Sequence, residues 1–147
     1  MKSFNFLIAI FTIFLFSSSA VADDQNYKDA GEFYEINYLL LKAIAQTESG
    51  QNPNAVNCAN SNGTCDYGIM QVNSVHLSTL KKNGIPVDKL LDEKVNIYMG
   101  AWVLKGCIGK YGFTSKTLNC YNGKINGNNY YSKVLKNYDM LAKSSGQ

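Results

Sequence analysis

The chain has 147 residues, of which 46% are hydrophobic and 17% are charged, and its formal net charge at pH 7 is +3. This length suits one domain with one hydrophobic core. The sequence has no basic run and no alternation of basic and aromatic residues, so composition and charge argue against nucleic-acid binding.

Residues 1–22 have the pattern of a secretory signal. One lysine and an apolar run from Phe4 to Phe16 precede an A-x-A cleavage site that ends at Ala22. The apolar run is too short for a comfortable membrane span, and no second long apolar run follows. We therefore expect removal of residues 1–22, a mature chain of residues 23–147 that forms one domain, and no transmembrane segment.

Beyond this signal the sequence predicts helices joined by polar turns. The apolar spacing and the capping residues indicate six helices, at about Asn26–Tyr34, Asn37–Gly50, Ser74–Lys82, Glu93–Lys110, Thr114–Tyr121 and Asn128–Lys143. A polar loop, with room for a short hairpin, is expected from Gln51 to Tyr67. Few stretches alternate with period two, so we predict a mostly α fold with at most a small β-hairpin.

Glu48 lies at the end of the second predicted helix, on its apolar face. Leu41, Ala45 and Glu48 are spaced i, i+4 and i+7, so they share one side of the helix. A carboxylate that faces a core, near the C-terminal end of a helix dipole, has a raised pKa. A general acid near neutral pH requires such a shift. The alternative is a glutamate that rotates into solvent at a frayed helix end.

The later helices have apolar faces of their own. For the long helix this face comprises Val95, Met99, Trp102, Val103 and Cys107, with Trp102 expected in the core. For the last helix it comprises Tyr131, Val134, Leu135, Tyr138 and Leu141. His76 is the only histidine, and we expect it on a helix surface or partly packed.

Four cysteines lie in the expected mature chain. An even number in an exported protein favours two disulfides. Three connectivities are possible, and proximity in sequence favours Cys58–Cys65 and Cys107–Cys120. A zinc site is the alternative, but neither pair has C-x-x-C spacing and there is a single histidine. We expect no metal and no organic cofactor.

Five short motifs follow one another along the chain. They are Glu48-Ser49-Gly50, Tyr67-Gly68-Ile69-Met70-Gln71-Val72-Asn73, Asn96-Ile97 with Gly100, Cys120-Tyr121-Asn122-Gly123, and the stretch from Asn129 to Leu135. Each motif is weak alone. Their order and spacing, from about Tyr27 to Leu141, resemble the soluble lytic transglycosylase (SLT) family with its α+β, lysozyme-like fold. The resemblance is greatest to small exported members that accompany type III and type IV secretion systems, pili and conjugation machinery.

The resemblance implies an enzyme that acts on peptidoglycan. Such enzymes cleave the β-1,4 bond between N-acetylmuramic acid and N-acetylglucosamine, and the muramyl C6 hydroxyl closes a 1,6-anhydro ring without water. Glu48 would act first as the acid and then as the base. One carboxyl can serve both steps because the substrate supplies the nucleophile, unlike the usual two-carboxylate glycosidase.

The matched motifs also imply substrate-binding roles. Ser49 would orient Glu48 or contact the sugar, with ordinary helix-end hydrogen bonding as the alternative. Gly68 would bring the backbone close to the sugar. Met70 and Gln71 would line the cleft, with core packing as the alternative for Met70. Asn73, at the end of the same motif, is included among the substrate-binding residues.

The last two motifs supply three further site residues. Tyr121 would hydrogen-bond Glu48 or stabilise positive charge that develops on the sugar ring. Asn122 would bind an N-acetyl or hydroxyl group, with a plain turn as the alternative. Tyr130 would border the cleft, although the neighbouring Tyr131 leaves open which of the two faces inward.

Asp66 directly precedes Tyr67-Gly68 and is a candidate second carboxylate. It would stabilise positive charge at C1 of the sugar. The alternative is a loop aspartate that caps its own backbone.

Two other functions stay open at this stage. A hydrolytic muramidase of the same fold would use water, and a peptidoglycan-binding assembly adaptor would have little activity. In every case the expected partners are glycan strands, with components of an envelope-spanning machine as further candidates. The expected location is the bacterial periplasm or cell envelope, with an extracellular location as the alternative, and the expected state is a monomer.

Overall fold

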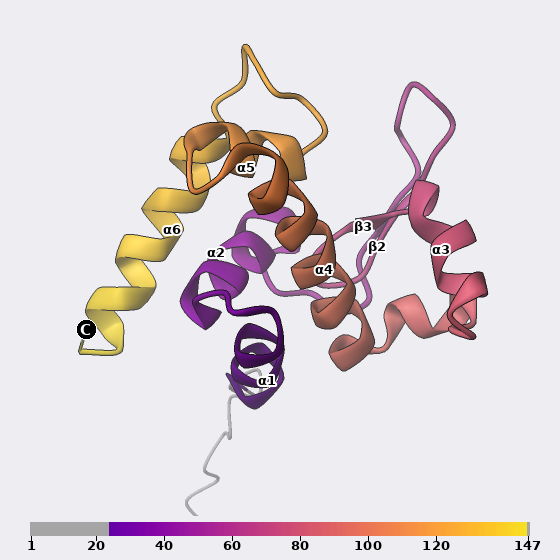
Figure 1. Cartoon of the computed structure of the whole chain (residues 1–147), viewed down its shortest axis with the longest axis horizontal. Coiled ribbons are helices and arrows are strands. Elements are labelled where there is room, and N and C mark those ends of the chain that lie inside the picture. Colours follow the sequence, from indigo (N-terminus) through magenta and orange to yellow (C-terminus); the bar gives the residue numbers. More distant parts are fainter. Residues whose placement is uncertain (1–23, 147) are drawn as a thin grey trace, which may run out of the picture.

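The computed structural model describes residues 24–146, so the predicted signal segment lies outside the described residues. Figure 1 shows the elements in chain order, which are α1 (Asp24–Tyr34), α2 (Tyr38–Ser49), β1 (Val56–Asn57), β2 (Asp66–Tyr67), β3 (Val72–Asn73), η1 (Ser74–His76), α3 (Leu77–Lys82), η2 (Val87–Leu91), α4 (Glu93–Tyr111), α5 (Ser115–Tyr121) and α6 (Tyr130–Ser144). All six predicted helices are present. None of the helices between residues 24 and 146 is both long and apolar enough to cross a membrane.

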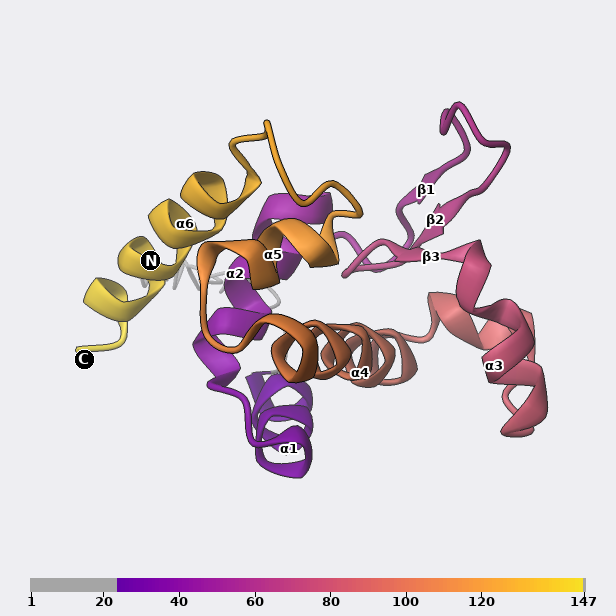
Figure 2. The ribbon, with the colours of Figure 1, turned by 45° about the horizontal axis from the view of Figure 1, so that its top comes forward.

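The structure has a helical part and a smaller part built around a sheet. Helix α2 lies in the middle of the helical part, with α6 on one side and α1 and α4 on the other (Figures 1 and 2). The sheet and α3 lie on the side of α4 that faces away from α6. The three antiparallel strands have the order β1-β2-β3, so the expected hairpin is present and β3 widens it.

Local sequence signals explain where α2 begins and ends. The Asn37 side chain accepts a hydrogen bond from the Leu39 amide at 2.9 Å, and Gly50 closes the helix in the left-handed conformation with φ 63°. Between these caps, Leu41 and Ile44 are fully buried. Burial of each such side chain contributes about 1.5 to 3 kcal/mol, so packing rather than helix propensity holds α2 in place.

Helix α4 is buried on more than one side, which changes the predicted pattern. Asp92 caps it by accepting a hydrogen bond from the Val95 amide at 3.1 Å. The fully buried stripe contains Ile97, Ala101 and Leu104, at i, i+4 and i+7. The placement of Trp102 in the core was wrong, because its side chain is 36% exposed beside this stripe.

Helix α6 buries Tyr130 and not Tyr131, which decides the choice that the sequence left open. Tyr130 is 6% exposed and Val134 is fully buried, whereas Tyr131 is 36% exposed. The buried residues follow the helical spacing from Tyr130, the first residue of the helix, to Val134 at i+4. The inward position predicted for Tyr131 was therefore wrong.

Both predicted disulfides are present. Cys58–Cys65 closes the loop between β1 and β2, and Cys107–Cys120 joins α4 to α5. In the chain-entropy model, a disulfide that closes a loop as long as the one between Cys107 and Cys120 stabilises the fold by roughly 3 kcal/mol.

Asn96 anchors the turn after β2 to helix α4. This asparagine is fully buried, and its Oδ1 accepts a hydrogen bond from the Met70 amide at 2.8 Å. Its Nδ2 donates to the carbonyl oxygens of Tyr67, at 2.8 Å, and Leu90, at 2.7 Å. Gly68, with φ +74°, packs so tightly here that a Cβ would overlap the Asn96 side chain.

Replacement of Asn96 by Ala tests this anchor. The substitution leaves three backbone groups without their partner, so we expect the free energy of unfolding to fall by about 2 to 4 kcal/mol. Urea unfolding measures the change. The control is Asn54→Ala in the exposed loop after α2, which should change stability by less than about 0.5 kcal/mol. Equal stabilities of the two variants would contradict the anchoring role.

Candidate functional site

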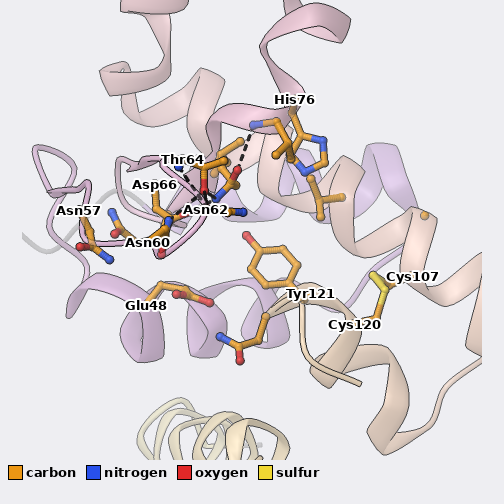
Figure 3. Close-up of a pocket in the computed structure, with 18 of the residues that line it drawn as sticks. Glu48, Asn57, Asn60, Asn62, Thr64, Asp66, His76, Cys107, Cys120 and Tyr121 are labelled. Carbon is orange, nitrogen blue, oxygen red and sulfur yellow. Dashed lines mark hydrogen bonds between the residues drawn. A yellow bond between two sulfur atoms is a disulfide. The ribbon is translucent and has the colours of Figure 1, made fainter. Parts of the chain in front are cut away.

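A cleft of about 890 Å³ lies between the helical part and the sheet. Its lining comes from the end of α2, the sheet, η1, the middle of α4 and the end of α5. Figure 3 shows Glu48 and Asp66 among the residues that line it. Glu48 and Asp66 are the charged residues among the described lining, and no lysine or arginine of the described chain belongs to it. The cleft is therefore acidic although the chain as a whole is basic.

The environment of Glu48 favours its protonated form near neutral pH. Burial raises the pKa of Glu48 from its ordinary value of 4.5 to about 7, and the charge of Asp66 adds to this effect. A hydrogen bond from the Tyr130 hydroxyl to Glu48 Oε1, at 2.6 Å, acts in the opposite direction. Glu48 can thus hold or release a proton close to pH 7.

Tyr130 is the direct partner of Glu48. Since Tyr130 is only 6% exposed and is not among the residues that line the cleft, it offers little surface to a ligand there. Burial, and then the nearby Glu48, raise the pKa of Tyr130 far above its usual range, so the hydroxyl stays a donor. The sequence prediction placed Tyr130 at the border of the cleft but did not anticipate this bond.

Side-chain amides hold the carboxylate of Asp66 in place. Asn73 Nδ2 donates to Oδ1 at 2.7 Å, and Asn60 Nδ2 donates to Oδ2 at 2.8 Å. The Thr64 hydroxyl accepts a further hydrogen bond from each amide, at 3.2 Å from Asn60 and 3.0 Å from Asn73. These bonds go to side chains, so Asp66 is not a cap of its own backbone. The Asn73 amide is thereby used within the protein, although Asn73 lines the cleft.

Three predicted substrate contacts serve the framework instead. Met70 is fully buried, and a Cβ on Gly100 would lie 2.6 Å from its Sδ, so the prediction that Met70 lines the cleft was wrong. The Ser49 hydroxyl donates to the Ile69 carbonyl at 2.7 Å. Gly68 is buried against Asn96 and Leu90. This packing leaves no room for a Cβ, so contact with a sugar is not needed to explain why position 68 is a glycine.

Gln71 and Asn122 do line the cleft. Gln71 Nε2 donates to the carbonyl oxygens of Gly68, at 2.9 Å, and Ala55, at 3.2 Å, so this side chain is fixed. Asn122 is exposed, and its side chain makes no hydrogen bond within the described residues. It is therefore available to a ligand.

Tyr121 lines the cleft but does not bond Glu48. Its hydroxyl donates to the Met70 carbonyl at 2.8 Å. Burial raises the pKa of Tyr121 well above its usual range, and the nearby Glu48 adds to this effect. Tyr121 is hence a neutral phenol whose hydroxyl is held by the Met70 carbonyl, and the residue before it, Cys120, is joined to Cys107 by a disulfide. The predicted bond from Tyr121 to Glu48 was wrong, and Tyr130 makes it.

Sequence reasoning missed two groups of cleft residues. Asn57, Asn60 and Asn62 gather along one wall, and the density of asparagine between Gln51 and Tyr67 was the signal that could have found them. The second group is an aromatic pair, in which the rings of His76 and Trp102 meet edge to face with centroids 5.5 Å apart. No local pattern links these two residues, because they lie on separate elements.

Among residues 24–146 no cluster of three or more His, Cys, Asp or Glu side chains is arranged to hold a metal ion.

Comparison with known proteins gives consistent similarities. The family described as "Transglycosylase SLT domain" matches residues 25–144. Invasion protein IagB of Salmonella typhi is 34% identical over 125 residues, covering 80% of this chain and 78% of IagB. Protein IpgF of Shigella flexneri is 35% identical, covering 80% of this chain and 82% of IpgF.

A solved structure supports the fold. The X-ray structure of an inactive mutant of lytic transglycosylase Slt from Pseudomonas aeruginosa matches with a TM-score of 0.70 at 17% sequence identity. The match covers 86% of this chain but 25% of Slt, so the chain spans about a quarter of that protein.

The stability of Glu48→Gln as a function of pH tests the shifted pKa. Below pH 4.5 the carboxyl is protonated in both the folded and unfolded states, so Glu48 and Gln should give similar stability. Between pH 4.5 and 7 only the unfolded state loses its proton, and wild-type stability falls. We expect Glu48→Gln to be more stable than wild type by about 3 kcal/mol above pH 7.

Two further variants sharpen this test. Tyr130→Phe removes the bond that lowers the pKa of Glu48, so the loss of stability should continue to a higher pH than in wild type. Glu32→Gln, on the exposed side of α1, is the matched control. A Glu48→Gln profile that runs parallel to wild type from pH 4 to 8 would contradict the buried, protonated state.

Proposed function

The chain belongs to the transglycosylase SLT domain family, and from this premise we propose that it cleaves the β-1,4 bond between N-acetylmuramic acid and N-acetylglucosamine and leaves a 1,6-anhydro end. The family membership makes it a peptidoglycan lytic transglycosylase. The observation that supports the proposed formation of a 1,6-anhydro end is Glu48, a half-buried carboxyl at the cleft with a pKa of about 7.

A single carboxyl can perform both proton transfers of this reaction. Protonated Glu48 donates to the glycosidic oxygen as the bond from that oxygen to C1 breaks. The resulting carboxylate then accepts the proton of the muramyl C6 hydroxyl as its oxygen forms a bond to C1. Glu48 ends protonated again, and no water is consumed. A pKa near the working pH favours both transfers.

The neighbours of Glu48 support the two states of this cycle. The Tyr130 hydroxyl orients the carboxyl and, once Glu48 is ionised, makes a charge-assisted hydrogen bond to it. Tyr130 is thus a positioning residue. Asp66 lines the same cleft, and we assign its carboxylate to the stabilisation of positive charge on C1.

The cleft suits an N-acetylated glycan in its chemistry. Asn57, Asn62 and Asn122 line it and can exchange hydrogen bonds with hydroxyl and N-acetyl groups. The described lining has no lysine or arginine that could bind an anion. We assign substrate binding to this polar wall and to the walls formed by Gln71, Asn73 and Tyr121.

A hydrolytic muramidase is the second candidate, and Asp66 is the observation that favours it. Two carboxyl groups that line one cleft are what a water-using glycosidase requires. The raised pKa of Glu48 suits either reaction, so the products decide.

The setting that we propose for the reaction rests on the names of the relatives, the disulfides and the sequence. We propose that residues 1–22 direct export and are removed, and that the chain acts on the cell wall in the bacterial envelope. Two disulfides fit an oxidising compartment. Since one relative is named an invasion protein, we propose that the chain opens the wall for an envelope-spanning secretion apparatus, with pilus and conjugation machines as related settings.

Product analysis tests the reaction itself. We expect the mature protein, incubated with purified peptidoglycan, to release muropeptides that are lighter by one water molecule than hydrolysed ones, as measured by mass spectrometry. Glu48→Gln should lower the rate by at least about 100-fold, because it removes the proton donor, while Glu32→Gln should match wild type. Hydrated products that depend on Glu48 would establish the muramidase instead.

Asp66→Asn tests the second carboxylate in the same assay. The amide keeps the shape but not the charge, so we expect the rate of anhydro-product release to fall about 10-fold or more if Asp66 stabilises charge on C1. Asp88→Asn, an exposed position in η2, is the control. Full activity of folded Asp66→Asn would remove this residue from the mechanism.

A further inference from the structure

Trp102 has an unusual position for the only tryptophan of the chain. It lies on α4, the longest described helix, yet 36% of its side chain is exposed, and it lines the cleft. Tryptophan is a large apolar side chain with a single polar N–H, and its exposure in a concave site is typical of binding surfaces. The indole is therefore available to a ligand.

His76 supports the indole from a different element. This histidine ends η1, and its ring meets that of Trp102 edge to face, with an interplanar angle of 87°. Burial lowers the pKa of His76, so its imidazole is neutral near pH 7. Val75, which is 58% exposed, and Val103 belong to the same lining. Together these four residues form an uncharged, mostly apolar end of the cleft.

This apolar end is distinct from the catalytic end. Figure 3 shows His76 and Glu48 on opposite sides of Tyr121 in the cleft. The charged lining residues, Glu48 and Asp66, are both acidic, and the described lining offers no cation that would pair with a carboxylate. The carboxylates of a peptide stem would gain nothing here. A sugar ring fits better, because it has an apolar C–H face and a polar rim, as does the indole.

We propose that Trp102 and His76 form a subsite that binds an uncharged N-acetylated sugar ring, by stacking of the ring on the indole, at a distance from the bond that is cleaved. The subsite extends the proposed function, on which it rests for the identity of the polymer. It gives the enzyme a hold on the glycan backbone that does not depend on the peptide stems.

Binding of chitohexaose, an uncharged polymer of N-acetylglucosamine, tests the subsite without any cleavage assay. Trp102 is the only tryptophan, so the tryptophan emission of the mature protein, excited selectively over its tyrosines, reports on this position alone. We expect a saturable change of the Trp102 emission on titration. By calorimetry, Trp102→Ala should bind chitohexaose about 10-fold more weakly, whereas Trp102→Phe should lose less because a smaller aromatic face is retained.

Phe113→Ala is the matched control, since this aromatic side chain is 80% exposed and lies outside the cleft lining. It should bind like wild type. Thermal unfolding of each variant checks its fold, and if Trp102→Ala is unfolded then the wild-type fluorescence and Trp102→Phe decide. An unresponsive indole, or a folded Trp102→Ala that binds within 2-fold of wild type, would overturn the subsite.

A peptidoglycan assay separates the two proposals. Trp102→Ala should raise KM about 10-fold with little change in kcat, because the subsite binds the strand away from Glu48. If wild type released no anhydro products, the proposed reaction would fail, while the response of Trp102 to chitohexaose would still decide the subsite. A fall in kcat alone with unchanged KM would contradict a binding role for Trp102.

Discussion

The turn of residues 68–70 is the constraint on which the rest of the structure depends. Its backbone groups bond to side chains from three helices, because Asn96 of α4 binds the Met70 amide, Ser49 of α2 binds the Ile69 carbonyl and Tyr121 of α5 binds the Met70 carbonyl. A backbone group left unpaired in this buried region would cost about 1 to 3 kcal/mol. The turn therefore sets the relative positions of the sheet and the helices, and with them the width of the cleft.

This arrangement gives the family motifs a physical meaning that differs from direct substrate contact. The Glu-Ser motif contributes one residue to the cleft and one to the framework, since Glu48 lines the cleft while Ser49 holds the turn. Gly68 and Gly100 leave room for Asn96 and Met70 at places where a Cβ would not fit. The motifs occur together because each supplies a part of one interlocked site.

The electrostatics of the cleft follow from the same packing. Burial raises the pKa of Glu48, and the hydrogen bond from Tyr130 limits the rise. The resulting pKa is about 7. Asp66 is kept in place by neutral amides, not by a cation. The described lining of the cleft is therefore acidic and contains no lysine or arginine.

The sequence by itself determined the features that depend on neighbouring residues. The capping residues Asn37 and Gly50 mark the two ends of α2, and Asp92 marks the start of α4. Short separations in sequence identified both disulfides. Helical spacing alone placed Glu48 on the inner face of α2, because residues i, i+4 and i+7 lie on one side whatever the rest of the chain does.

Only the tertiary structure decided the roles that depend on distant partners. Tyr130 bonds Glu48 across 82 positions of sequence, and Tyr121 bonds Met70 across 51, so no local pattern could distinguish these two tyrosines. Trp102 is exposed to the cleft because α4 is covered by other elements on several sides, and periodicity does not reveal which sides those are. Contacts between elements depend on how whole helices pack, and that packing is a property of the complete fold.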